Sequence, residues 1–221
     1  MGAKAGTNDV GERMREICAL APVIPVLVIH DAAHARPLAE ALIAGGLPVI
    51  EVTLRTPAAL AAIEAMAMLP GAVVGAGTLL APGDVRAAVA AGAAFGVSPG
   101  ATDRLLEACA REALPLLPGA ATASEAMALL ECGHDMVKFF PAEAAGGVAM
   151  LRALAGPLPQ LRFCPTGGIG PGNARDYLAL ANVACVGGSW VAPPDLIAAG
   201  DWAEIESRAR AAARMRPEGG A

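Results

Sequence analysis

The 221-residue chain has few aromatic residues, few charges and almost no lysine. Aromatic side chains make up 3% of the sequence and charged ones 17%, and the formal net charge is −5. Nucleic-acid-binding proteins use basic patches and stacking aromatic rings, so this composition argues against DNA or RNA as a partner. A hydrophobic content of 55% excludes a disordered chain and is sufficient for a large core.

The sequence shows no convincing membrane-spanning segment or secretory signal. One long uncharged run, residues 177–194, just reaches the length of a spanning helix. It contains Asn182, two adjacent glycines and two adjacent prolines, so we interpret it as a buried strand between loops. The first ten residues are polar and lack the apolar segment of a secretory signal. We therefore expect a cytoplasmic protein with no membrane partner.

Cysteine and histidine residues give no pattern typical of a metal site. The cysteines are Cys18, Cys109, Cys132, Cys164 and Cys185, an odd number with no CxxC pair. We expect them to be reduced core residues, as in a cytoplasmic protein. The histidines are His30, His34 and His134, and none has a spacing to nearby carboxylates that predicts metal ligands.

Short runs rich in Val, Ile, Leu and Phe alternate with longer stretches of helical character. The predicted strands are Val23–Ile29, Val49–Leu54, Ala72–Thr78, Ala94–Pro99, Leu114–Gly119, Met136–Pro141, Leu161–Thr166 and Val183–Ser189. The predicted helices are 10–20, 34–44, 57–68, 82–91, 102–112, 122–132, 146–154, 171–180 and 201–214. Strands alternating with helices at roughly 20–25 residues per unit indicate parallel strands with crossover helices.

The number of these units favours an α/β fold of the (β/α)8 TIM-barrel type over an open doubly wound sheet. Residues 10–20 precede the first strand and predict an extra N-terminal helix. No linker or shift in composition divides the chain. We therefore expect a single domain over 1–221, with frayed ends at 1–9 and 215–221.

The second predicted strand carries opposite charges on one face. Side chains alternate along a strand, so Glu51, Thr53 and Arg55 share one face. The other face is apolar and should meet the helices, so we expect the polar face to point into the barrel. Charges buried there are costly unless they are paired or used. A structural ion pair remains the alternative interpretation.

Lys138 stands in the middle of the sixth predicted strand and is the only lysine outside the polar N-terminal tail, which carries Lys4. Burial disfavours the ammonium form of a lysine and makes its free amine available as a nucleophile. Arginine, which supplies the other basic residues, does not deprotonate. A lysine that is ion-paired or reaches solvent is the alternative.

The seventh and eighth predicted strands both end in adjacent glycines. Gly167 and Gly168 follow one strand, and Gly187 and Gly188 precede Ser189 at the end of the other. Glycine lets the backbone approach a ligand and direct N–H groups at an anion, and these two loops often bind phosphate in TIM barrels. The alternative is that the glycines serve only the turns.

Together these residues describe an amine nucleophile, a carboxylate, an arginine and a phosphate cradle. An amine converts a carbonyl group into an iminium ion, which accepts electrons when a neighbouring C–C bond breaks. A carboxylate can move the protons, and an arginine can hold a substrate carboxylate. The residues therefore predict aldol cleavage of a phosphorylated 2-keto acid, and their spacing does not name the substrate.

The sequence resembles the bacterial aldolases for 2-keto-3-deoxy-6-phosphogluconate (KDPG) and 4-hydroxy-2-oxoglutarate (KHG). The resembling segments are EVTLRT (51–56), VGAGT (74–78), SPG (98–100), VKFFPAE (137–143), RFCPTGGI (162–169), NARDYLAL (173–180) and GGSW (187–190). They occur in order from about Val23 to Asp201, and KFFPAE and FCPTGG are highly specific. One departure is Ala145, where the family pattern has an asparagine.

The resemblance implies a role for each matching residue. Lys138 would form the Schiff base, and Glu51 would be the general acid and base. The implied substrate contacts are Arg55 and Thr78 for the pyruvate carboxylate, Pro99 as a pocket wall, and Thr166 near the aldehyde carbon. The implied phosphate contacts are Gly167, Gly168, Gly188 and Ser189. The family needs no metal and no cofactor, and its members are usually homotrimers on a TIM barrel.

The resemblance thus implies a Schiff-base aldolase that cleaves KDPG to pyruvate and glyceraldehyde 3-phosphate, and KHG to pyruvate and glyoxylate. Three alternatives remain open on sequence alone. One is an aldolase for the epimeric 2-keto-3-deoxy-6-phosphogalactonate. Another is a phosphate-binding isomerase or epimerase that needs no imine. The third is a degenerate barrel that only binds a sugar phosphate, against which the presence of Lys138, Glu51 and Arg55 argues.

Overall fold

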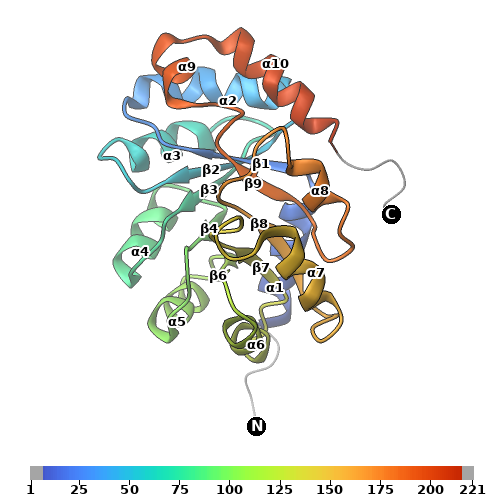
Figure 1. Ribbon diagram of the computed structural model, residues 1–221. Helices are drawn as coiled ribbons and strands as arrows, with labels where there is room; N and C mark the ends of the chain where they lie inside the picture. Colours follow the sequence, from blue (N-terminus) through green and yellow to red (C-terminus); the bar gives the residue numbers. More distant parts are fainter. Residues whose placement is uncertain (1–6, 216–221) are drawn as a thin grey trace.

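The computed structural model describes residues 7–215 as an α/β fold with a curled parallel sheet surrounded by helices (Figure 1). The strands are β1 Val23–Leu27, β2 Val49–Thr53, β3 Val73–Gly77, β4 Phe95–Val97, β5 Leu116–Leu117, β6 Gly119–Ala120, β7 Met136–Phe139, β8 Arg162–Pro165 and β9 Val186–Gly188. The helices are α1 Thr7–Ala19, η1 Ala32–His34, α2 Ala35–Ala44, α3 Ala59–Ala67, α4 Pro82–Ala90, α5 Asp103–Arg111, α6 Ala123–Glu131, α7 Gly147–Ala155, α8 Ala174–Leu178, α9 Pro194–Ala199 and α10 Trp202–Ala213.

The strands pair in two parallel groups, as the alternation of strands and helices predicted. One sheet has the order β5-β4-β3-β2-β1-β9, and the other has the order β6-β7-β8. Two isolated parallel bridges, Phe163 to Val183 and Thr166 to Gly187, connect the β8 segment with the β9 segment. The carboxyl ends of these parallel strands therefore lie on the same side of the molecule.

The expected single strand Leu114–Gly119 is wrong, because Pro118 interrupts it. Proline has no N–H to donate to a neighbouring strand. β5 pairs with β4 before this residue, and β6 pairs with β7 after it. The Pro118 carbonyl still accepts a hydrogen bond from the Lys138 N–H at 2.8 Å, so the junction remains attached to β7.

Several other boundaries differ from the sequence-based expectation. The helix expected over 171–180 covers only Ala174–Leu178, because Pro171 and Gly172 form a turn before it. The short helix α9, Pro194–Ala199, was not predicted. Of the ends expected to be frayed, residues 1–6 and 216–221 lie outside the described part of the chain, whereas residues 7–9 belong to α1.

None of the helices within 7–215 is long and apolar enough to cross a membrane.

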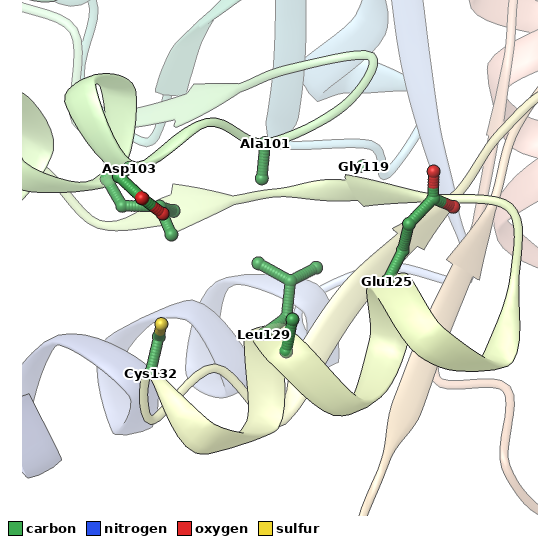
Figure 2. Close-up of a pocket in the computed structure, with 8 residues that line it drawn as sticks. Ala101, Asp103, Gly119, Glu125, Leu129 and Cys132 are labelled. Atoms are coloured by element: carbon green, nitrogen blue, oxygen red, sulfur yellow. The ribbon is translucent and has the colours of Figure 1, made fainter.

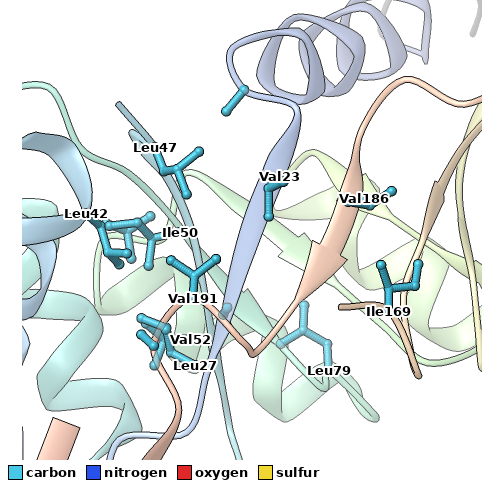
Figure 3. Packing of buried hydrophobic residues seen from close by; sticks show 14 of the residues in the cluster. Val23, Leu27, Leu42, Leu47, Ile50, Val52, Leu79, Ile169, Val186 and Val191 are labelled. Atoms are coloured by element: carbon cyan, nitrogen blue, oxygen red, sulfur yellow. The ribbon is translucent and has the colours of Figure 1, made fainter. Parts of the chain in front are cut away.

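Two hydrophobic clusters follow from side-chain alternation along the strands. The larger one lies between the strands and the outer helices, and Figure 3 shows Leu42 of α2 near Ile50 of β2 within it. The smaller one contains Met14, Ile17 and Cys18 of α1 together with strand residues such as Phe95 and Met136. α1 therefore packs against the inner side chains near the amino ends of the strands, and the polar side chains of the same inner faces lie further along.

Candidate active site

Lys138 and Glu51 meet inside the curled sheet although they are 87 positions apart in the sequence. Ile50 and Val52 belong to the outer cluster, so alternation turns Glu51 of β2 inward. The same rule turns Lys138 of β7 inward, since its neighbours Val137 and Phe139 pack on the outside. Lys138 Nζ lies 3.4 Å from Glu51 Oε1, and the two residues are 5% and 3% exposed.

Gly77 lies against Glu51, and the ring of Phe140 lies near Lys138. A Cβ at Gly77 of β3 would lie 2.2 Å from Glu51 Oε1, so a larger residue there would displace the carboxylate. On the other side, Lys138 Nζ lies 5.2 Å from the centroid of the Phe140 ring, within the range of a cation–π interaction. The position of the pair therefore depends on the packing of β2, β3 and the β7 segment.

Cys164 of β8 is aligned with Lys138 in the parallel pairing of β7 and β8. A hydrogen bond with Cys185 and burial raise the pKa of the Cys164 thiol well above its ordinary value. A neutral thiol is a poor nucleophile. Among the strand residues facing this interior, Lys138 and Glu51 are therefore the groups suited to nucleophilic and acid–base chemistry.

Arg55 and Thr78 lie together at the carboxyl ends of neighbouring strands. The Nε–H of Arg55 donates to Thr78 Oγ1 at 3.2 Å, and Arg55 is exposed. Thr78 has a φ of 63°, which is uncommon for a residue with a side chain. Thr53, expected on the same polar face as Arg55, is buried and donates to the Leu27 carbonyl at 2.8 Å. Thr53 therefore joins β2 to β1.

A cavity of about 260 Å³ brings most of the predicted binding residues together. Its lining residues are Val26, Val28, Arg55, Phe140, Thr166, Gly167, Gly168, Ile169, Gly187, Gly188, Ser189, Ala192 and Pro194. Neither Lys138 nor Glu51 lines this cavity; Lys138 Nζ lies 5.2 Å from the ring centroid of Phe140, which does. Thr78 does not line it either, and is hydrogen-bonded to Arg55, which does. No sequence motif predicted Val26 and Val28 as lining residues, because their position depends on how β1 meets its neighbouring strands.

Pro99 does not line this cavity, although the resemblance implied that it forms a pocket wall. It is partly buried and follows β4. A Cβ at Gly119 would lie 2.3 Å from the Pro99 carbonyl oxygen, and Gly119 is aligned with Lys138 in the strand pairing. Pro99 therefore approaches the site from the β4 side, next to the strand that neighbours Lys138.

The glycine pairs have geometric reasons of their own. Gly167 and Gly168 have φ values of 101° and 77°, a region that side chains disfavour. A Cβ at Gly187 would lie 2.3 Å from Thr166 Oγ1, and one at Gly188 would lie 1.7 Å from the Trp190 ring. Turn geometry and close packing thus require glycine at these positions, and the same glycines leave their backbone open to the cavity.

A second, smaller pocket of about 140 Å³ lies between α5 and α6 on the outside of the fold (Figure 2). The Glu125 carboxylate beside it accepts hydrogen bonds from the Ala121 and Thr122 amides, and these bonds lower its pKa. None of the site residues predicted from the sequence lines this pocket.

Within residues 7–215, no group of three or more His, Cys, Asp or Glu side chains is placed to hold a metal ion.

Comparisons with known proteins agree with this geometry. Residues 14–208 match the model of the family described as KDPG and KHG aldolase. The chain is 53% identical to the KHG/KDPG aldolase of Escherichia coli over 192 residues, which are 86% of this chain and 90% of that protein. The chain belongs to the KDPG and KHG aldolase family. The family resemblance of the sequence is thereby confirmed, and the protein is an aldolase, a carbon–carbon lyase.

Solved structures of other family members have the same fold. The KDPG aldolase of Zymomonas mobilis with 3-phosphoglycerate superposes with a TM-score of 0.90 at 48% identity, covering 96% of this chain and all of that one. The KDPG aldolase of Legionella pneumophila superposes with a TM-score of 0.88 at 50% identity, covering 90% of this chain and 97% of that one. That enzyme was captured with pyruvate as a covalent carbinolamine intermediate.

Proposed function

We propose that this aldolase cleaves KDPG to pyruvate and glyceraldehyde 3-phosphate, and KHG to pyruvate and glyoxylate. The observation that carries the proposal is the buried pair of Lys138 Nζ and Glu51 Oε1, 3.4 Å apart, beside the glycine-lined cavity. The names of the relatives and the pyruvate carbinolamine in the Legionella enzyme support the same chemistry. Cleavage of KDPG would place the enzyme in the Entner–Doudoroff pathway.

In this mechanism the free amine of Lys138 attacks C2 of the substrate, and water leaves to form an iminium ion. Glu51, directly or through a water molecule, removes the proton of the C4 hydroxyl group. The C3–C4 bond then breaks, its electrons move into the iminium system, and the aldehyde departs. The remaining enamine of pyruvate takes a proton at C3 from Glu51. Water then adds to C2 and releases pyruvate and the free lysine.

The binding roles follow the positions of the polar groups. Arg55 and Thr78 hold the carboxylate of the pyruvate half, because a guanidinium matches a carboxylate with two hydrogen bonds. Thr166 contacts the substrate near the aldehyde carbon, and Pro99 limits the site from the β4 side. The proposed phosphate contacts are the backbones of Gly167, Gly168 and Gly188 and the hydroxyl group of Ser189.

We further propose that the sheet closes into a (β/α)8 barrel of one domain over 1–221, with α1 as the extra N-terminal helix. Counting β5 and β6 as one strand joins the two sheets at Pro118, and the bridges between the β8 and β9 segments support closure on the other side. The protein would act in the cytoplasm as a homotrimer. Light scattering should then give a mass near three times the 22.0 kDa of one chain.

Borohydride trapping tests the central step. Reduction in the presence of pyruvate should produce a stable adduct that peptide mapping places on Lys138, and Lys138→Arg should abolish both the adduct and cleavage. An adduct on Lys4, or loss of activity with a chelator, would contradict this mechanism. Absence of both the adduct and cleavage in the wild-type protein would favour the imine-free isomerase or epimerase. Rates on KDPG, its galactonate epimer and KHG then rank the three substrates.

A further inference from the structure

A buried tyrosine and a glutamate form a contact just behind the two cavity loops. Tyr177 of α8 is fully buried, and its hydroxyl group donates a hydrogen bond to Glu143 Oε1. Glu143 lies in the turn that follows β7, five residues after Lys138. Neither Tyr177 nor Glu143 lines the cavity, so any effect on bound substrate must pass through residues that do.

Glu143 supports the Gly167–Gly168 loop from one side. Its backbone N–H donates to the Gly167 carbonyl at 3.1 Å. A Cβ at Gly168 would lie 2.6 Å from Glu143 Cγ and 2.8 Å from Glu143 Cβ. The methylene groups of Glu143 therefore lie directly against Gly168, and their position limits where the backbone of Gly168 can go.

Asn173, the residue just before α8, binds the same loop. The side-chain amide of Asn173 donates to the Gly168 carbonyl at 3.1 Å, and its oxygen accepts from the Gly170 N–H at 2.8 Å. Tyr177 follows Asn173 by about one helical turn, so the two side chains attach α8 to the loop and to Glu143. The loop is thus clamped between α8 and the turn after β7.

The surroundings of the Tyr177 hydroxyl group keep this contact in place. Burial, followed by the hydrogen bond to Glu143, raises the pKa of Tyr177, so the hydroxyl group remains a donor over the physiological range. A Cβ at Gly147, where α7 begins, would lie 3.1 Å from the Tyr177 hydroxyl oxygen. Glycine at 147 therefore leaves the space that the hydroxyl group occupies. With its oxygen bound to Tyr177, the carboxylate is kept from turning toward an incoming anion.

We propose that Tyr177 and Glu143 are positioning residues that hold the Gly167–Gly168 backbone in the conformation that receives the substrate phosphate. The inference rests on the proposed phosphate site. It predicts selectivity, because a looser loop and a freed carboxylate should weaken binding of a phosphorylated substrate. KHG carries no phosphate and should be affected much less.

Steady-state kinetics on both substrates test this role. Tyr177→Phe keeps the ring and should raise KM for KDPG about 10-fold, with kcat and the KM for KHG changed less than twofold. Glu143→Ala should change the two KM values in the same direction, and the double variant should be no worse than Glu143→Ala alone, since that variant already removes the shared contact. Glu143→Gln is the matched control, because its amide oxygen can still accept from Tyr177, and its KM for KDPG should stay within twofold of the wild type.

Amide hydrogen exchange of residues 166–170 provides a readout that does not need aldolase activity. Exchange there should be faster in Tyr177→Phe and Glu143→Ala than in the wild type and in Glu143→Gln. Equal losses on both substrates, or unchanged exchange in these residues, overturn the inference. Failure of the wild-type enzyme to form a pyruvate adduct would overturn the proposed function instead, and the exchange comparison would still decide the positioning role.

Discussion

At the scale of single residues, the reactivity proposed for Lys138 depends on its burial next to Glu51. An isolated buried charge is costly, so each group stabilises the charged form of the other, and the amine becomes nucleophilic only after its proton has left. Because the two groups are 3.4 Å apart, the Glu51 carboxylate is also close to a substrate that is bonded to Lys138 Nζ. The two groups should nevertheless be separable by experiment, because imine formation requires mainly the amine and proton transfer requires the carboxylate.

Glu51→Gln should separate these steps. The variant should still form some borohydride-trapped pyruvate adduct, and exchange of the pyruvate methyl protons with solvent should fall by about 10²-fold or more, the scale of general acid–base catalysis. Proton NMR in deuterated buffer measures the exchange. Near-ultraviolet circular dichroism controls for folding. Exchange at the wild-type rate in a folded variant would exclude Glu51 as the base.

Ser189→Ala tests the proposed phosphate contact more cleanly than a change at Gly168. Gly168 has a positive φ and lies against Glu143, so any side chain there would cause strain independently of phosphate. Removing the exposed Ser189 hydroxyl group should cost about 1.5–3 kcal/mol in kcat/KM for KDPG, the range for a hydrogen bond to a charged group. Cleavage of KHG should be nearly unchanged, and Ser124→Ala on α6 is the control. Equal effects on both substrates would remove Ser189 from phosphate binding.

At the scale of elements, α1 contributes to the inner cluster beneath the site. Met14, Ile17 and Cys18 of α1 are buried against strand residues that share their inner faces with Glu51 and Lys138. This contact fills the interior near the amino ends of the strands. α1 should therefore be part of the stable core, even though it precedes the first strand.

Met14→Ala should lower the free energy of unfolding by about 2–5 kcal/mol, because it removes buried atoms and leaves a cavity. Urea denaturation followed by circular dichroism measures the change. Arg13→Ala on the same helix is the matched control, since Arg13 is exposed and its ion-pair partner Glu16 is exposed as well. A loss below about 1 kcal/mol for Met14→Ala would show that α1 is not tightly coupled to the core.

At the scale of the whole molecule, three pKa shifts define a pH range of maximal stability. Burial lowers the pKa of His134 below 6.5, and backbone hydrogen bonds lower that of Glu125 below 4.5. The unfolded chain then binds more protons than the folded one in acid, so stability falls with falling pH. Burial raises the pKa of Cys109 to about 11 from 9.0, so the unfolded chain loses its proton first and stability falls in alkali.

The free energy of unfolding should therefore be highest between pH 6.5 and 9.0. It should decline as acid first reaches the range of His134 and then that of Glu125, and as base passes from 9.0 toward about 11. Urea denaturation across this range measures the profile. His134→Gln should reduce the decline just below pH 6.5, and Cys109→Ala should reduce the alkaline decline. A profile with no decline on either side would contradict the assigned shifts.

Features that depend on local backbone geometry were predictable from the order of the amino acids. Alternation along a strand placed Glu51 on an inner face, the apolar strand around Lys138 marked that lysine as buried, and the repeated units predicted parallel strands with helices outside. The glycine pairs predicted the two loops that line the cavity. These inferences succeeded because each one needs only a few neighbouring residues and the fixed periodicity of a strand.

Tertiary structure alone decided which of these residues touch. The Lys138–Glu51 distance depends on how far the sheet curls between β2 and β7, and no local pattern contains that curvature. The break at Pro118 depends on which neighbour each half-strand pairs with. The contact between Tyr177 and Glu143 joins residues 34 positions apart, and it forms only because α8 packs against the turn after β7. Periodicity assigns a side chain to a face, whereas its partner is set by packing between distant segments.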